Sequence, residues 1–304
     1  MSIKDSHPDR NQPVIFLMGP TASGKTELAK EMYKNLDCEL ISVDSALVYR
    51  GLDIGSAKPT AEELQITPHH LIDVCEPLQP YSASQFCTDA RTIIDKTIGK
   101  GKIPILVGGT MLYFRALRDG LADLPTADPE IRKQITALAN RSSWQAVHEQ
   151  LSIVDPEAAA RIPIGDSQRI QRALEVFMIS GKPLTQHFKE QSIKPLPYPI
   201  INIAIAPVER SLLRKRIRLR FEQMLDKGLI DEVDCLYRQK GLSADLPALR
   251  SVGYRQVCQY LAGEIDSQTM KEKAITATCH LAKRQMTWLR SWPDLYWLET
   301  DDKE

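Results

Sequence analysis

Short apolar runs alternate with amphipathic helical segments over the first part of this chain. Apolar runs at 14–18, 39–43 and 103–107 are bounded by glycine or polar residues, which is typical of buried strands. Residues 70–74 form a weaker candidate for a further strand. Buried strands that alternate with helices predict a parallel sheet with helices on both faces.

Between residues 119 and 195 the pattern changes to helices separated by turns, without a clear strand. Asp and Ser side chains cap the first amides of helices, so they mark where each helix begins. Helix starts are expected near Asp128, Ser143, Asp155 and Asp166. An apolar strand resumes at 199–207, which indicates that the helical block interrupts the sheet.

The first apolar run ends in GPTASGKT and is followed by a helix-forming segment. This is a G-x-x-x-x-G-K-[ST] phosphate loop in its required setting of strand, loop and helix. Its amides and the helix start favour a polyphosphate, Lys25 adds a positive charge, and the Thr26 hydroxyl is placed to hold Mg²⁺. The predicted phosphate-binding residues are Gly19, Pro20, Thr21, Ala22, Ser23, Gly24, Lys25 and Thr26.

The expected fold class is therefore α/β, with a P-loop-type parallel sheet core flanked by helices and an inserted all-helical domain. The core comprises residues 1–118 and 196–304, and the insertion comprises residues 119–195. A chain of 304 residues is long enough for a core and a second lobe.

Two further strand ends are polar. Asp44 and Ser45 follow the second strand, and Gly109 and Thr110 follow the strand at 103–107. Ligands of open parallel sheets lie beyond the carboxyl ends of strands, so these residues should meet the phosphate loop at one crevice. Asp44 could serve there as a magnesium ligand or as a general base. The strand end ILVGG carries no acidic residue that could hold a metal ion or a water molecule, which argues against ATP hydrolysis. The Thr110 hydroxyl and backbone amides remain as donors to a leaving oxyanion.

The net charge does not indicate whether the protein binds nucleic acid, but the distribution of charge along the chain does give an indication. Lys and Arg total 39, as do Asp and Glu, but the segments 208–220 and 280–290 are rich in basic residues. A helix that begins at Asp166 presents Gln168, Arg169 and Arg172, whose forked donors suit phosphates and base edges. A solvated helix face explains each of the two basic segments equally well when it is taken alone, and a capped surface helix is the better interpretation of the segment at Asp166 taken alone.

The six cysteines form no C-x-x-C pair, which points to reduced thiols and not to structural zinc. No apolar stretch approaches the length of a membrane span, and the first ten residues are polar. We therefore expect a cytoplasmic protein with no membrane partner. Nothing in the sequence demands a dimer, so a monomer is expected.

Six blocks along the chain are distinctive: GPTASGKT, ISVDSALVYRGLDIGSAKP, LVGGTMLYFRAL, DSQRIQRALEVFMISGKP, RSVGYRQ and AKRQMTWLR. They occur in the same order in the tRNA dimethylallyltransferases, which the chain resembles over nearly its whole length. The resemblance implies transfer of a dimethylallyl group from dimethylallyl diphosphate, with Mg²⁺, to N6 of the adenine immediately 3′ of the anticodon. The expected substrates are tRNAs that read codons beginning with U. The helical domain is expected to bind their anticodon stem-loop.

The resemblance also assigns roles to individual residues. Asp44 would take the proton from the adenine N6 amine, Thr110 and Arg220 would contact the diphosphate, and the phosphate loop would hold the diphosphate of the donor. The segments implied to touch tRNA are Asp44, Ser45, Ala46, Leu47; Gln168, Arg169, Ile170, Gln171, Arg172; and Arg250, Ser251, Val252, Gly253, Tyr254, Arg255. Leu47 stands where many members of the family have glutamine, so a polar base contact at that position is in doubt.

Three alternatives share some of these features. A nucleotide or small-molecule kinase also carries a phosphate loop, and the helical insertion could be mistaken for its lid. An adenylate isopentenyltransferase acting on free nucleotide would have little use for the insertion. A GTP-type switch would need N-K-x-D and D-x-x-G elements in usable positions, and the chain lacks them.

Overall fold

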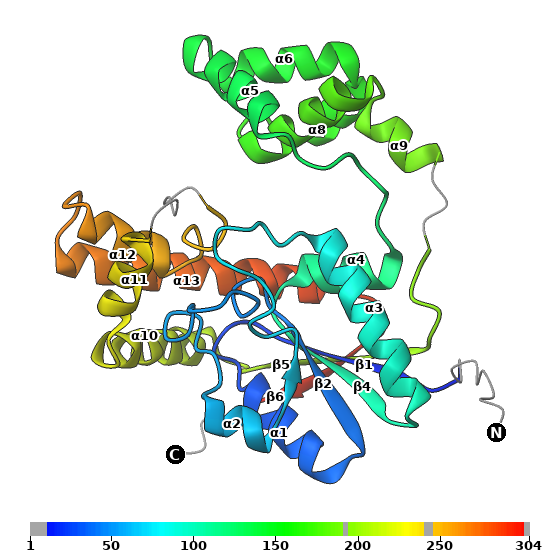
Figure 1. Ribbon diagram of the computed structural model, residues 1–304, viewed down its shortest axis with the longest axis vertical. Helices are drawn as coiled ribbons and strands as arrows, with labels where there is room; N and C mark the ends of the chain where they lie inside the picture. Colours follow the sequence, from blue (N-terminus) through cyan, green and yellow to red (C-terminus); the bar gives the residue numbers. More distant parts are fainter. Residues whose placement is uncertain (1–10, 191–193, 240–245, 301–304) are drawn as a thin grey trace. The chain divides into compact units, whose positions relative to one another are not determined.

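The computed structural model describes residues 11–190, 194–239 and 246–300, and the chain divides into two compact units (Figure 1). The larger unit combines the ranges 1–118 and 196–304, and the smaller unit is 119–195. The smaller unit thus interrupts the larger one in the sequence, at the residues where the hydrophobic pattern changes.

The larger unit is built on a sheet with the strand order β3-β2-β4-β1-β5-β6. Each neighbouring pair of these strands is parallel. The strands are β1 (Val14–Met18), β2 (Cys38–Val43), β3 (His69–His70), β4 (Ile103–Gly108), β5 (Ile200–Ala206) and β6 (Leu295–Glu299). The prediction of a parallel α/β sheet is confirmed.

Two details of the strand prediction were wrong. The strand expected at 70–74 ends at His70, because Leu71 and Asp73 have positive φ angles of 63° and 54° and turn the chain. Strand β6 was not predicted. It lies at the edge of the sheet and is mostly exposed, so it lacks the apolar run that marks the buried strands.

Alternate residues of the strands face two different layers, as the two-residue period of a strand requires. In β1, Phe16 and Met18 pack with helices α3 (Ala83–Gly99) and α4 (Met111–Asp119). Ile15 and Leu17 belong to the core on the other face, where helix α1 (Lys25–Asn35) packs. Short helix α2 (Ala61–Ile66) precedes β3.

A second group of helices in the same unit packs against residues 48–52, which follow strand β2. Figure 1 shows these helices together beside the sheet. They are α10 (Arg210–Asp226), α11 (Leu229–Tyr237), α12 (Tyr254–Leu261) and α13 (Ser267–Arg290). Their shared core brings the C-terminal part of the chain to the segment that follows Asp44.

The smaller unit is helical, and its core is formed by residues such as Val147, Leu151, Ile170 and Leu174. The predicted helix starts are confirmed, since Asp128, Ser143, Asp155 and Asp166 each cap a helix through the side chain. Its helices are α5 (Pro129–Arg141), α6 (Trp144–Val154), α7 (Pro156–Arg161), α8 (Ser167–Ser180) and α9 (Leu184–Glu190). Throughout the described residues, no helix combines the length and the apolar character needed to cross a membrane.

Candidate active site

The phosphate loop connects β1 to α1 and lies against the end of β5. A Cβ atom on Gly19 would lie 2.4 Å from the carbonyl oxygen of Ile205, so only glycine allows this close approach. Gly24 has a φ of 93° and precedes α1, where no side chain caps the first amides. These amides are the groups with which a helix N-terminus binds an anion.

Lys25 lies folded over this loop. Its Nζ donates a hydrogen bond of 2.6 Å to the carbonyl of Pro20. Burial lowers the pKa of Lys25 to about 7, and the neighbouring Arg220 adds to the effect, while Asp44 opposes it. An anion at the loop would restore the attraction that a charged lysine needs.

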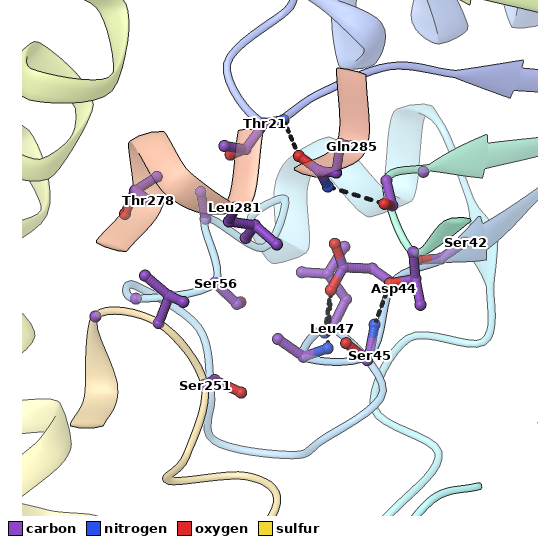
Figure 2. A pocket seen from close by; sticks show the side chains of 18 of the residues that line it. Thr21, Ser42, Asp44, Ser45, Leu47, Ser56, Ser251, Thr278, Leu281 and Gln285 are labelled. Carbon is purple, nitrogen blue, oxygen red and sulfur yellow. Dashed lines mark hydrogen bonds between the residues drawn. The ribbon is translucent and has the colours of Figure 1, made fainter. Parts of the chain in front are cut away.

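Asp44 and Thr110 occupy the ends of neighbouring strands β2 and β4. Asp44 Oδ1 accepts hydrogen bonds from the amides of Ala46 at 2.8 Å and Leu47 at 3.4 Å, which close a tight turn (Figure 2). Thr110 Oγ1 accepts a 3.1 Å bond from the amide of Ser45. The Thr110 amide donates to the carbonyl of Val43 at 3.2 Å, so the two strand ends are held together on both sides of Asp44.

One pocket of about 520 Å³ is lined by Thr21, Lys25 and Thr26 of the phosphate loop and by residues of both strand ends. Arg220 comes to it from helix α10, where burial lowers its pKa and nearby Asp44 partly offsets that effect. The apolar part of the wall is formed by Ile217, Phe221, Met224, Leu281 and Trp288. The pocket therefore combines an anion-binding loop, a carboxylate and an apolar wall.

Most of the residues predicted to bind phosphate or react are brought together in this pocket. Those that line it are Thr21, Lys25, Thr26, Asp44, Thr110 and Arg220. The strand-end segment Ser45, Ala46 and Leu47 lines it as well, as do Arg250, Ser251, Val252, Gly253 and Tyr254. The residues predicted in the larger unit that are not part of its lining are Gly19, Pro20, Ala22, Ser23, Gly24 and Arg255. Tyr254 is fully buried and its hydroxyl donates to Glu232 at 2.6 Å, which makes it a wall of the pocket.

The predicted block in helix α8 belongs to the helical unit. Gln168 and Arg169 are exposed, and Arg169 pairs with Asp166 at 3.1 Å. Ile170 is fully buried in the core of the unit, so its side chain is turned away from any ligand. Arg172 is bound to the buried carboxylate of Glu175 at 2.8 Å.

Gln285 and Ser42 are polar residues of the pocket that the sequence did not identify. Gln285 accepts a bond from the amide of Thr21 and donates one to the carbonyl of Gly109. The hydroxyl of Ser42 is buried at the pocket and has no hydrogen-bond partner among the described residues. Gln285 lies within the block AKRQMTWLR, which drew attention through its basic residues, and no local pattern distinguishes a buried glutamine there.

The fold and the pocket define a P-loop-type α/β protein with a carboxylate opposite its phosphate loop. The family model of IPP transferase matches residues 47–292, and that of isopentenyl transferase matches residues 12–76. The chain is 55% identical to the tRNA dimethylallyltransferase of Thioalkalivibrio sulfidiphilus, over 95% of this chain and 90% of the relative. It is 53% identical to the tRNA dimethylallyltransferase of Coxiella burnetii, over 97% and 95% of the two chains.

Solved structures agree with these relatives. The tRNA isopentenylpyrophosphate transferase of Bacillus halodurans is 35% identical, with a TM-score of 0.69 over 96% of this chain and 92% of that one. A eukaryotic dimethylallyltransferase acting on tRNA is 25% identical, with a TM-score of 0.80 over 96% and 75% of the chains. This chain therefore belongs to the IPP transferase family. The kinase alternative is not favoured.

Proposed function

We propose that this enzyme transfers the dimethylallyl group of dimethylallyl diphosphate to N6 of the adenine immediately 3′ of the anticodon, in tRNAs that read codons beginning with U. The observation that carries the proposal is the single pocket in which the phosphate loop, Asp44 and an apolar wall lie together. The loop suits a diphosphate, the apolar wall suits a five-carbon isoprenoid, and the carboxylate suits an amine that must lose a proton.

The donor would bind with its diphosphate on the amides at the start of α1. Lys25 and Arg220 add positive charge where the diphosphate acquires negative charge as the carbon–oxygen bond breaks. Thr110 supplies a hydroxyl at the neighbouring strand end. Because these groups are already in place, they stabilise the leaving group without reorganising.

The residues that line the pocket support binding of Mg²⁺ together with the diphosphate. The Thr26 hydroxyl lies at the pocket, and the buried Ser42 hydroxyl lacks a protein partner among the described residues. In the described part of the chain, no three His, Cys, Asp or Glu side chains gather as a metal cluster. Thr26 and phosphate oxygens would therefore hold the ion, which when bound would neutralise charge on the departing diphosphate.

Asp44 would receive the proton of the adenine amine. Both turn amides bind Oδ1, so Oδ2 is the oxygen that can accept the proton from N6. In the balanced step, the donor carbon–oxygen bond breaks, a carbon–nitrogen bond forms, the N6 proton passes to Asp44 and diphosphate leaves. An unpaired loop adenine can leave its stack and enter such a pocket at modest cost.

We also propose that the helical unit binds the anticodon stem-loop through its exposed side chains. Gln168 and Arg169 are exposed at the start of α8, where forked donors can reach phosphates. The phosphate loop and Asp44 come from one chain, which is consistent with action as a monomer. Its substrate tRNA would be met in the cytoplasm.

The test is transfer of a labelled dimethylallyl group to unmodified tRNA in the presence of Mg²⁺. The wild-type protein should label the tRNA at the adenine beside the anticodon, and a tRNA with guanine at that position should stay unlabelled. A parallel reaction with γ-labelled ATP tests the kinase alternative. Phosphate transfer to a small acceptor without labelling of the tRNA would reject the proposed function.

A further inference from the structure

Gln285 connects two loops of the pocket that are distant in sequence. It lies on helix α13, and its side chain is buried. Its Oε1 accepts a hydrogen bond of 3.0 Å from the amide of Thr21 in the phosphate loop. Its Nε2 donates a bond of 2.8 Å to the carbonyl of Gly109 at the end of β4, and Figure 2 shows both bonds.

The backbone around Gly109 is shaped to admit this side chain. A Cβ atom on Gly109 would lie 2.4 Å from Gln285 Nε2 and 3.2 Å from the carbonyl oxygen of Gly19. A larger residue would therefore push apart the glutamine, the phosphate loop and the end of β4. The amide of Thr21 is also used by Gln285, which leaves the amides at the start of α1 for an anion.

The connection continues to the residues beside Asp44. Gly109 precedes Thr110, whose hydroxyl accepts from the amide of Ser45 and whose amide donates to the carbonyl of Val43. Val43 and Ser45 are the two neighbours of Asp44 in the chain. A continuous path of hydrogen bonds and peptide bonds therefore runs from the phosphate loop through Gln285, Gly109 and Thr110 to both neighbours of Asp44.

We propose that Gln285 is a positioning residue for the transfer reaction, which fixes the separation between the phosphate loop and the strand ends that hold Asp44. This inference rests on the proposed function. Reacting atoms must lie about 3–3.5 Å apart, and a misplacement of about 1 Å can lower a rate by roughly 10²-fold. A carboxamide suits the role because it offers one acceptor and one donor without a charge.

The first test compares Gln285→Met with the wild type. Methionine has a similar length and neither hydrogen-bonding group, so the loops lose their connection while the core stays filled. We expect single-turnover transfer from saturating donor and tRNA to fall by about 30- to 100-fold, as expected for misplaced reactants. The affinity for Mg²⁺-pyrophosphate, measured by calorimetry, should change less than about threefold because its main donors are elsewhere.

The matched control is Gln268→Met, which makes the same change at an exposed position of the same helix, where the glutamine side chain donates a hydrogen bond to Glu272. It should transfer the label at the wild-type rate. Thermal unfolding of all variants checks that the fold is retained. A Gln285→Met rate within threefold of the wild-type rate would overturn the inference.

The second variant, Gln285→Glu, keeps the inference testable if methionine disturbs the fold. A carboxylate can accept from Thr21 but repels the carbonyl of Gly109, whereas a protonated carboxyl can donate to that carbonyl. The ratio of variant to wild-type rate should therefore rise as the pH is lowered. Lys25, Asp44, His69, Arg220 and Arg284 line the same pocket in both proteins, so dividing by the wild-type rate removes the pH dependence that the two proteins share.

The possible results separate the inference from the proposed function. A ratio that stays flat with pH for Gln285→Glu would indicate a packing role and overturn the inference. A pyrophosphate affinity that falls as much as the rate would do the same, because it would make Gln285 part of donor binding. If the wild-type protein itself transferred no label, the proposed function would fail and take this inference with it.

Discussion

The strand-end pocket and the helical unit both carry clusters of polar side chains, but the two regions use them differently. In the pocket, backbone amides fix Asp44 through Oδ1 and leave its other oxygen to the pocket. In the helical unit, Arg132 and Arg172 both bind the fully buried carboxylate of Glu175. Position after a buried parallel strand therefore brought the predicted residues together in one pocket, whereas part of the predicted block on α8 serves the core of its own unit.

The largest expected effect is the loss of transfer activity in Asp44→Asn, a substitution in the strand-end pocket. Asparagine keeps the acceptor for the amides of Ala46 and Leu47 but cannot take a proton from N6. Single-turnover transfer should fall by about 10³-fold or more, within the range for loss of a general base. Calorimetry with Mg²⁺-pyrophosphate should show near wild-type affinity, and a rate within tenfold of wild type would exclude Asp44 as the base.

Glu175→Leu tests the helical side of the comparison. The substitution leaves Arg132 and Arg172 without their buried partner, which should destabilise the unit by about 2–4 kcal/mol after allowance for their partial exposure. Hydrogen–deuterium exchange of the amides of α5 and α8, followed with increasing denaturant, would measure the loss in this unit. Binding of pyrophosphate, which involves the other unit, should be unchanged, and a comparable loss there would contradict the separation of roles.

The pH dependence of stability provides a second test of the structural role of Glu175 and its two arginine partners. Burial alone would raise the pKa of Glu175, but hydrogen bonds from Arg132 and Arg172 outweigh it and hold the pKa below its usual value. The stabilisation is therefore present above the pKa of the unfolded chain and is lost as pH falls through the lower pKa of the folded unit. Unfolding midpoints should fall on acidification in the wild type, with a smaller slope in Glu175→Leu.

Lys25 should make the affinity for pyrophosphate depend on pH, an effect of intermediate size. Its pKa of about 7 means that the free protein loses this charge as the pH rises, while a bound diphosphate favours the charged form. Affinity for pyrophosphate should be greatest below pH 7 and weaken by up to about tenfold per pH unit above it, with uptake of protons on binding. Subtracting the profile of Lys25→Met removes the titration of the ligand, and identical profiles would contradict this role.

The smallest effect is expected for Arg169→Ala, which tests whether this exposed arginine of the helical unit contacts tRNA. The affinity for tRNA should fall about three- to tenfold, and the salt dependence of binding should lose about one phosphate contact. Arg161→Ala is the matched control in the same unit, because that exposed arginine pairs with Glu157. Equal losses for the two variants, or a change in donor affinity, would contradict a specific contact by Arg169.

Much of the fold followed from local signals in the sequence. The apolar runs predicted β1, β2, β4 and β5, because strands buried on both faces need continuous apolar residues. The capping residues predicted where the helices of the smaller unit begin. Strand β6 escaped prediction because it is an exposed edge strand, and its place depends on pairing with β5.

The candidate site was predictable where chemistry follows a strand and unpredictable where it depends on distant packing. The phosphate loop, Asp44 and Thr110 could be recognised because the end of each strand places them. Gln285 could not, since its partners Thr21 and Gly109 are 264 and 176 residues away in the chain. Resemblance drew attention to Arg172, but its role in holding Glu175 becomes visible only in the packed unit.

The central claim is that one pocket holds the diphosphate and the target adenine at the same time. A structure of the protein with tRNA, Mg²⁺ and a non-reactive thio analogue of the donor tests it most directly. We predict diphosphate oxygens on the amides at the start of α1, and the adenine N6 within hydrogen-bonding distance of Asp44 Oδ2. An analogue bound away from the phosphate loop, or an adenine that does not reach Asp44, would contradict the account.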